Sequence, residues 1–156
     1  MLVGNGFDIH KHSDDKKLVL GGITVEGPGF EAHSDGDLIL HSLSDALLGS
    51  KAKKDLGFYF PSDKGTPKNI SSVEMLNTVL EIIEYDKIII NNIDITIISQ
   101  VISISKISDS IASSIANLLS VDKDLINVKG KSFDNLGVIG EGKASACFAI
   151  VSVRDA

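Results

Sequence analysis

Asp8 and His10 are the first residues whose types and spacing could do chemistry. They lie two positions apart in the opening segment GNGFDIH, which reads as a β-strand. Side chains at positions i and i+2 of a strand point to the same face, so the carboxylate and the imidazole face the same way. Two interpretations follow. The pair is either part of a solvated polar face or half of a metal site, because both groups are metal ligands. A third ligand elsewhere decides between them.

His41 could supply that third ligand. It lies in the segment AHSDGDLILHSLSDALLG, where a helix is expected from about residue 35 to 52 with Ser34 as its N-cap. Asp37 and Asp45 share its helical face, four residues to either side. A lone histidine in an apolar helix is more often a hydrogen-bonded core residue. One carboxylate with two imidazoles, however, is a ligand set typical of catalytic zinc. Asp45 either orients His41 or is a plain solvated carboxylate.

Strands and helices in both halves of the chain must position these residues. Strands are expected at 1–10, 17–26, 87–100, 124–130 and 144–153, and helices at about 35–52, 72–86 and 107–120. The Gly21-Gly22 pair is expected to turn a hairpin, since glycine accepts the positive φ that such turns need. Strands mixed with one-sided amphipathic helices predict an α+β fold, a mixed sheet with helices packed on one face. No repeat or linker divides residues 1–156, so one domain is expected.

Composition and charge narrow the class of protein. The net charge of −6 argues against a nucleic-acid partner, and no apolar stretch approaches the ~20 residues that span a membrane. The single cysteine, Cys147, lies in an apolar run and is expected in the core. The chain begins directly in a strand, so a bacterial cytoplasmic location is expected, with a plastid-type organelle as the alternative if a transit peptide has been removed. The Gly- and Pro-containing stretch 57–72 is either a flexible connection or a lid.

Five segments together carry a resemblance. GFDIH, AHSDGDLILHSLSDALLG, DLGFYFP, VKGKSFDNLG and GEGKASACFAI occur in this order. In this order and spacing they resemble the 2-C-methyl-D-erythritol 2,4-cyclodiphosphate synthase family over nearly the whole chain. The resemblance implies a phosphorus-oxygen lyase of the non-mevalonate isoprenoid pathway. Its substrate, 4-diphosphocytidyl-2-C-methyl-D-erythritol 2-phosphate, would be cyclised as the 2-phosphate attacks the β-phosphorus and CMP leaves. Such chemistry needs positioning and charge neutralisation rather than a protein nucleophile.

The resemblance also implies roles for particular residues. Asp8, His10 and His41 would bind Zn²⁺, or another divalent transition metal, with one position open to a β-phosphate oxygen. His33 and Ser132 would stabilise the transition state. Ser132 stands where the family usually has Thr, and it keeps the hydroxyl. Mg²⁺ or Mn²⁺ would bridge the diphosphate, supported by an acidic residue at position 134.

The substrate contacts implied by the resemblance fall in four places. They are an anion site at the helix N-terminus, a contact with the methylerythritol phosphate, a mobile loop beside it, and the walls of the cytidine and diphosphate site. In that order the residues are Ser34; Asp55, Leu56 and Gly57; Phe60, Pro61, Ser62, Asp63 and Lys64; and Ser99, Gln100, Val101, Ile102, Ser103, Ile104 and Ser105 with Lys131, Phe133 and Asp134.

Some positions depart from the family pattern. Ile102 and Ser103 replace the usual Pro-Lys pair, Ser62 and Asp63 follow FP where Asp is usual, and Glu141 replaces an Arg. No departure removes a zinc ligand.

The resemblance implies a homotrimer with active sites between subunits, and a cyclic trimer would bury the free face of the sheet. The alternative function is a zinc-binding trimer of the same fold with weak or lost turnover. A metal-dependent phosphohydrolase has the ligand chemistry, but the sequence shows no evident base for its water.

Overall fold

One mixed sheet, with strand order β2-β1-β5-β3-β4, forms the frame of the molecule. The computed structural model describes residues 1–63 and 65–156. Strand β3 pairs in parallel with β4 and antiparallel with β5, while β1 pairs antiparallel with both β5 and β2. The strands are β1 (Leu2–Leu20), β2 (Ile23–Phe30), β3 (Ile88–Ile98), β4 (Ile126–Lys131) and β5 (Ala144–Asp155). The mixed sheet expected from the sequence is therefore confirmed.

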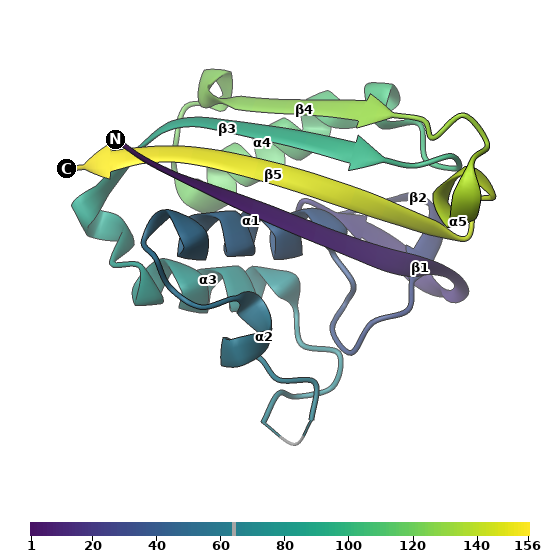
Figure 1. Ribbon diagram of the computed structural model, residues 1–156, viewed down its shortest axis with the longest axis horizontal. Coiled ribbons are helices and arrows are strands. Elements are labelled where there is room, and N and C mark those ends of the chain that lie inside the picture. Colours follow the sequence, from purple (N-terminus) through teal and green to yellow (C-terminus); the bar gives the residue numbers. More distant parts are fainter. Residues whose placement is uncertain (64) are drawn as a thin grey trace.

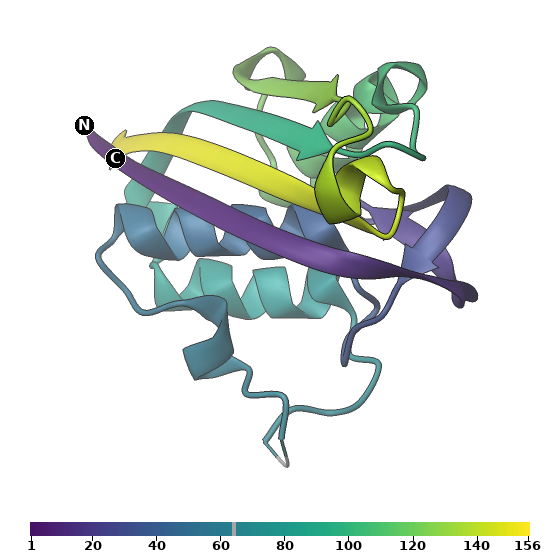
Figure 2. The same cartoon turned by 45° about the vertical axis from the view of Figure 1, so that its right-hand side comes forward.

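The longer helices lie together on one face of this sheet (Figures 1 and 2). Helix α1 lies against β1 and β5, α3 packs on the side of α1 away from the sheet, and α4 packs behind β4. The α-helices are α1 (Leu38–Ser50), α2 (Leu56–Tyr59), α3 (Ser72–Ile82), α4 (Ser108–Leu119) and α5 (Gly137–Gly140), and the 3₁₀ turns are Tyr85–Lys87, Ile104–Lys106 and Lys123–Leu125. The predicted α+β class, with helices on one face, is confirmed. The sequence patterns did not predict the single turns α2 and α5.

The main core fills the space between the sheet and the helices. Alternate residues of β3, such as Ile93, Ile95 and Ile97, are fully buried there, as expected for a strand with one covered face. Cys147 is buried in the same core, as predicted, and burial raises the pKa of its thiol to about 12. A second, smaller cluster forms where Ile139 of α5 packs against residues of β5. None of the helices in the described part of the chain is long and apolar enough to cross a membrane.

Two glycines let α1 lie directly on the backbone of β1. A Cβ atom at Gly4 would stand 1.9 Å from the carbonyl oxygen of Ala46, and one at Gly6 would stand 1.9 Å from that of Ser42. Only glycine fits such a close approach. Because side chains alternate along a strand, Asp8 projects from the same face of β1 as these glycines. The close packing therefore brings the helix to the face where Asp8 points.

The first strand is longer than the sequence patterns predicted. It runs to Leu20 rather than ending near residue 10. The first half of β1 pairs with β5 and the second half with β2, so each half gains its own hydrogen-bonding partner. The hairpin itself is confirmed, with φ of +63° at Gly21 and +83° at Gly22, and with Leu20 paired to Ile23.

The predicted start of the first helix was wrong. Helix α1 begins at Leu38 rather than near residue 35, and its N-cap is Asp37 rather than Ser34. The Asp37 carboxylate accepts hydrogen bonds from the N–H groups of residues 39 and 40, and also from those of Gly21 and Gly22, at 2.6 to 3.1 Å. It is fully buried, and burial raises its pKa against the opposing effect of these N–H groups. A contact with the distant hairpin thus selects Asp37 over Ser34.

Candidate active site

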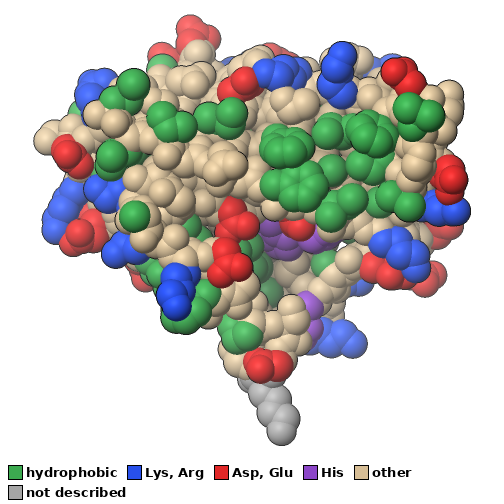
Figure 3. Space-filling view, viewed as in Figure 1, with side chains coloured by type: hydrophobic (Ala, Val, Ile, Leu, Met, Phe, Trp, Pro, Cys, Tyr) green, Lys and Arg blue, Asp and Glu red, His purple; other side chains and the backbone are tan. Residues whose placement is uncertain are grey.

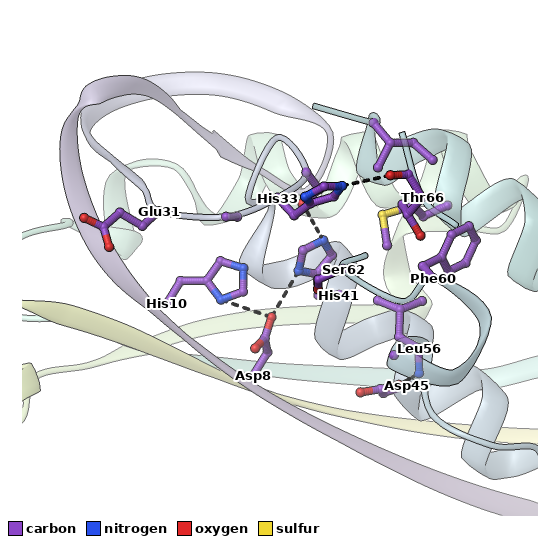
Figure 4. Close-up of a pocket in the computed structure, with 15 residues that line it drawn as sticks. Asp8, His10, Glu31, His33, His41, Asp45, Leu56, Phe60, Ser62 and Thr66 are labelled. Atoms are coloured by element: carbon purple, nitrogen blue, oxygen red, sulfur yellow. Dashed lines mark hydrogen bonds and ion pairs between the residues drawn. The ribbon is translucent and has the colours of Figure 1, made fainter. Parts of the chain in front are cut away.

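Strand β1 and helix α1 bring Asp8, His10 and His41 together. Asp8 Oδ2 lies 3.1 Å from His41 Nδ1 and 3.4 Å from His10 Nδ1. The three side chains converge on one point (Figure 4), and one ligand atom from each lies within 4.8 Å of the others. The third ligand that the sequence required is therefore in place, which favours a metal site over a solvated polar face.

The electrostatics of the triad suit a cation. Burial opposes ionisation of Asp8, but hydrogen bonds and charge from His10 and His41 outweigh it and lower its pKa to about 2. Burial also disfavours the charged form of His10, but Asp8 outweighs it and raises the His10 pKa. The buried Nε2 of His10 has no hydrogen-bond partner among residues 1–63 and 65–156. Because a buried imidazole nitrogen is normally paired, a bound cation fits this donor set.

Ser72 and Asp35 determine which nitrogen of His41 faces the triad. The Ser72 hydroxyl donates to the Asp35 carboxylate, which can only accept. With its one proton used, Ser72 Oγ accepts a hydrogen bond from His41 Nε2 at 3.0 Å. Nδ1 of the neutral ring then carries the lone pair and faces an oxygen of Asp8. Two acceptors in that position require a proton or a metal ion between them.

The sequence patterns did not identify Ser72 and Asp35 as part of the site. The two residues lie 37 positions apart, and no local spacing connects them. Neither alternative considered for Asp45, orienting His41 or a plain solvated carboxylate, describes its position. Its carboxylate accepts a hydrogen bond from the N–H of Leu56 at 2.6 Å and makes no hydrogen bond to His41 in the described part of the chain. Asp45 therefore holds the first residue of α2 by a hydrogen bond. Burial raises the pKa of its carboxyl group.

A cavity of about 360 Å³ opens beside the triad. Of the residues considered from the sequence, those that line it are Asp8, His10, His33, Ser34, His41, Asp45, Leu56, Gly57, Phe60 and Ser62. Glu31, Ala32, Thr66, Ile70 and Met75 also line it and were not predicted. His33 Nε2 lies 2.9 Å from the carbonyl oxygen of Thr66 (Figure 4). The stretch 57–72 thus contributes several residues to one side of this cavity.

Three described residues of the predicted methylerythritol phosphate contact and loop are not among those that line this cavity. Asp55 is at the N-cap position of α2, and Pro61 and Asp63 belong to the neighbouring loop. Lys64 lies outside the described residues. Ser34 does not cap α1, but its Oγ lies 3.2 Å from His41 Nε2 and accepts a hydrogen bond from the N–H of Gly36.

A second hollow, of about 230 Å³, is lined by most of the residues predicted to form the cytidine and diphosphate wall. Its lining residues are Ser99, Ile102, Ser103, Ile104, Ser105, Gly130, Lys131 and Ser132. The parallel pairing of β3 with β4 explains this, since Ile98 pairs with Lys131 and the carboxyl ends of both strands meet at one edge. Within the described residues of one chain, no residue lines both hollows.

The other predicted wall residues lie next to this hollow rather than in its lining. The N–H of Phe133 donates to Gln100 Oε1 at 3.3 Å, which ties the two walls together. Asp134 accepts a hydrogen bond from Ser132 Oγ at 3.3 Å and has a φ of +48°. Val101 lines a separate surface hollow with Lys143.

Comparisons with known proteins match this chain over almost its whole length. A model of the YgbB family matches residues 1–154. The 2-C-methyl-D-erythritol 2,4-cyclodiphosphate synthase of Haemophilus ducreyi is 41% identical over 149 residues, covering 95% of this chain and 93% of that protein. The bifunctional enzyme IspD/IspF of Pelagibacter ubique is 41% identical over 151 residues, covering 96% of this chain and 41% of that protein.

Solved structures agree with these matches. The IspF structure of Plasmodium falciparum in complex with CDP superposes with a TM-score of 0.85 at 38% identity, covering 99% of this chain and 96% of that one. The bifunctional IspDF of Campylobacter jejuni gives a TM-score of 0.93 at 33% identity, covering 99% of this chain and 42% of that one. The family model, the curated relatives and the shared fold confirm the resemblance seen in the sequence: the chain belongs to the YgbB family.

Proposed function

We propose that residues 1–156 form one 2-C-methyl-D-erythritol 2,4-cyclodiphosphate synthase domain. The enzyme converts 4-diphosphocytidyl-2-C-methyl-D-erythritol 2-phosphate to the 2,4-cyclodiphosphate and releases CMP, as a phosphorus-oxygen lyase of the non-mevalonate pathway. The observation that carries this proposal is the Asp8–His10–His41 triad beside a cavity that also contains His33. Relatives of that name match the chain over nearly its whole length.

The residues of the chain position the reacting phosphates. An oxygen of the 2-phosphate attacks the β-phosphorus, and the bond from that phosphorus to the bridging oxygen breaks, so CMP departs with the α-phosphate. A Zn²⁺ ion held by the triad, with Mg²⁺ or Mn²⁺ on the diphosphate, would supply Lewis-acid charge neutralisation. His33 and Ser132 donate hydrogen bonds where negative charge grows, and Ser34 receives the phosphate end of the substrate. This division of labour explains how a chain with a net charge of −6 handles so anionic a substrate.

We propose that the protein works as a homotrimer with its active sites between subunits. The sheet face opposite the helices carries Phe7, Ile9, Phe148 and Ile150, each about 45% exposed, and the rings of Phe7 and Phe148 lie 4.7 Å apart. Hydrophobic side chains gather on the half of this face nearest α5 (Figure 3). Exposed apolar patches of this kind favour association. A cyclic trimer would cover the patch and set the 99–105 wall of one subunit beside the triad of the next.

The bacterial origin of the curated relatives supports a cytoplasmic location in a bacterium. We propose a small-molecule substrate, and neither a nucleic acid nor a membrane, as the binding partner.

Release of CMP from the pathway substrate, in the presence of Zn²⁺ and Mg²⁺, tests the proposed function. The purified protein should produce CMP and the cyclic diphosphate in equal amounts. A His41→Ala variant should lose both bound zinc and activity, because one of the three protein ligands is gone. Ser50→Ala, which removes a buried hydroxyl at the other end of α1, should retain both.

The same assay separates the alternatives. A protein that binds zinc stoichiometrically yet releases no CMP would be the non-catalytic zinc-binding trimer. Appearance of inorganic phosphate in place of the cyclic product would indicate a metal-dependent phosphohydrolase instead.

A further inference from the structure

We propose that His12 and Ser145 are positioning residues for the nucleotide wall, acting through Ser99. The inference rests on the proposed function, since that function assigns residues 99–105 to nucleotide binding. Neither His12 nor Ser145 lines the hollow formed by that wall. Ser145 is fully buried, and His12 lines the neighbouring surface hollow with Val101, so the proposed effect on a bound nucleoside diphosphate travels through a chain of hydrogen bonds.

The chain of hydrogen bonds crosses three strands of the sheet. His12 Nε2 of β1 lies 2.8 Å from Ser145 Oγ of β5, and that oxygen lies 2.8 Å from Ser99 Oγ, just after β3. Ser99 Oγ then accepts hydrogen bonds from the N–H of Ile102 at 3.1 Å and from that of Val101 at 3.3 Å. The relay thus ends on the backbone of the wall itself.

Both ends of this relay are held by backbone groups. At the far end, His12 Nδ1 lies 3.3 Å from the carbonyl oxygens of both Pro28 and Gly29. Carbonyls only accept, so Nδ1 carries a proton at this end of the relay. The Ser145 and Ser99 hydroxyls share one hydrogen bond, and at the other end the Ser99 oxygen accepts from the two backbone N–H groups.

Burial makes this relay rigid. Ser145 is 0% exposed and Ser99 is 6% exposed, so water does not replace a lost partner at either hydroxyl. The His12 ring stacks on the buried Phe30 ring, with centroids 4.7 Å apart and an interplanar angle of 27°. A stacked ring with both nitrogens paired has no freedom to turn away.

Ser99 also joins the two walls of the hollow. Its N–H donates to the carbonyl oxygen of Lys131 at 2.9 Å, while its hydroxyl holds the turn that leads to Ile102. Loss of the relay would leave buried N–H groups without their acceptor and loosen the turn. Since Ser145 is fully buried and cannot touch a ligand, any loss of nucleotide affinity on its truncation must be indirect.

Calorimetric titration with CDP, on protein loaded with Zn²⁺ and Mg²⁺, tests the inference. Ser145→Ala and His12→Phe each break the relay, and the phenylalanine keeps the stacking on Phe30. Each variant should bind CDP about 10-fold more weakly, the effect of one lost buried hydrogen bond. Zinc stoichiometry should stay unchanged. The double variant should be no weaker than the worse single variant, because both substitutions break one chain of bonds.

Ser50→Ala is the matched control. It deletes a buried hydroxyl that donates to the Leu47 carbonyl, away from the wall, and should lower the denaturation midpoint without changing CDP affinity. Wild-type CDP affinity in both relay variants would overturn the positioning role and leave the proposed function standing. Absence of CDP binding by the natural protein would instead overturn the nucleotide pocket and this inference with it. Should Ser145→Ala fail to fold, the His12→Phe titration decides alone.

Discussion

At the scale of single residues, the orientation of His41 depends on Ser72 and Asp35, which do not line the cavity beside the triad. Ser72 accepts from His41 Nε2 and is itself held by Asp35, so Nδ1 is presented to Asp8 in one orientation. Partners of this kind keep a ligating imidazole in the right tautomer, and their loss typically lowers metal affinity by about 10- to 100-fold.

Ser72→Ala is therefore expected to weaken zinc binding by about 10-fold, at the low end of that range. Ser34 Oγ, 3.2 Å from the same nitrogen, remains as a second acceptor and limits the loss. Competition with a chelator of known affinity measures the effect. Ser71→Ala, which removes only the cap of α3, is the neighbouring control and should lower stability without changing zinc affinity. Equal zinc affinities for the two variants would contradict the role of Ser72.

Ser132 supports a second prediction at this scale. If its hydroxyl donates to charge that develops during the reaction, Ser132→Ala should lower kcat with little change in KM. Ser132→Thr keeps the hydroxyl and should retain most of the activity. Steady-state kinetics of CMP release distinguish the three proteins, and a wild-type kcat in the alanine variant would remove Ser132 from the mechanism.

The sequence could predict those parts of the site that depend on residue type and local spacing, but not those that depend on tertiary contacts. The residue types at positions 8, 10 and 41 are read directly from the sequence. The alternation of side chains along a strand also predicts that those at positions 8 and 10 point to the same face. The partners of His41 are serine and aspartate, which occur on any surface. Their contact exists only because the loop before α1 meets the start of α3.

At the scale of elements, periodic apolar patterns placed the main strands and helices, because burial of one face dictates both patterns. The errors occurred at element ends that depend on tertiary contacts. Serine is a residue type that often caps helices, but Gly36, two positions after Ser34, has a φ of +77°. Helix α1 therefore begins only at Leu38. Asp37 replaces Ser34 as the cap because the β1–β2 hairpin offers it two further N–H donors.

Asp37→Asn is the variant that tests this junction. Asp37 Oδ1 accepts from Gly21, Ile39 and Leu40, while Oδ2 accepts from Gly22. An asparagine keeps one acceptor but turns an NH₂ group toward one of these donors, leaving at least one buried N–H unpaired. A loss of about 1–3 kcal/mol in the free energy of unfolding is expected. Urea denaturation measures it, and an unchanged midpoint would show that the carboxylate does not join helix and hairpin.

At the scale of the whole molecule, two halves of one predicted site lie in separate hollows. The triad and His33 line one, while Ser132 and most of the 99–105 wall line the other. An exposed apolar face, with Phe148 and Ile150 on β5, lies on the side of the sheet opposite the helices. Both facts have one explanation if adjacent subunits complete each other's site.

Mixing two impaired variants tests that arrangement directly. A His41→Ala chain keeps its wall, and a Ser132→Ala chain keeps its triad. In a 1:1 mixture of trimers that have exchanged subunits at random, each interface takes a sound triad with probability one half and a sound wall with probability one half. About one quarter of the sites should then regain full activity, so CMP release should exceed the sum of the separate proteins. A mixture of His41→Ala with the double variant should show no gain, because no interface then has a sound triad. If subunit exchange is demonstrated by light scattering of tagged chains and activity still fails to rise, the site lies within one subunit. The apolar face would then serve association alone.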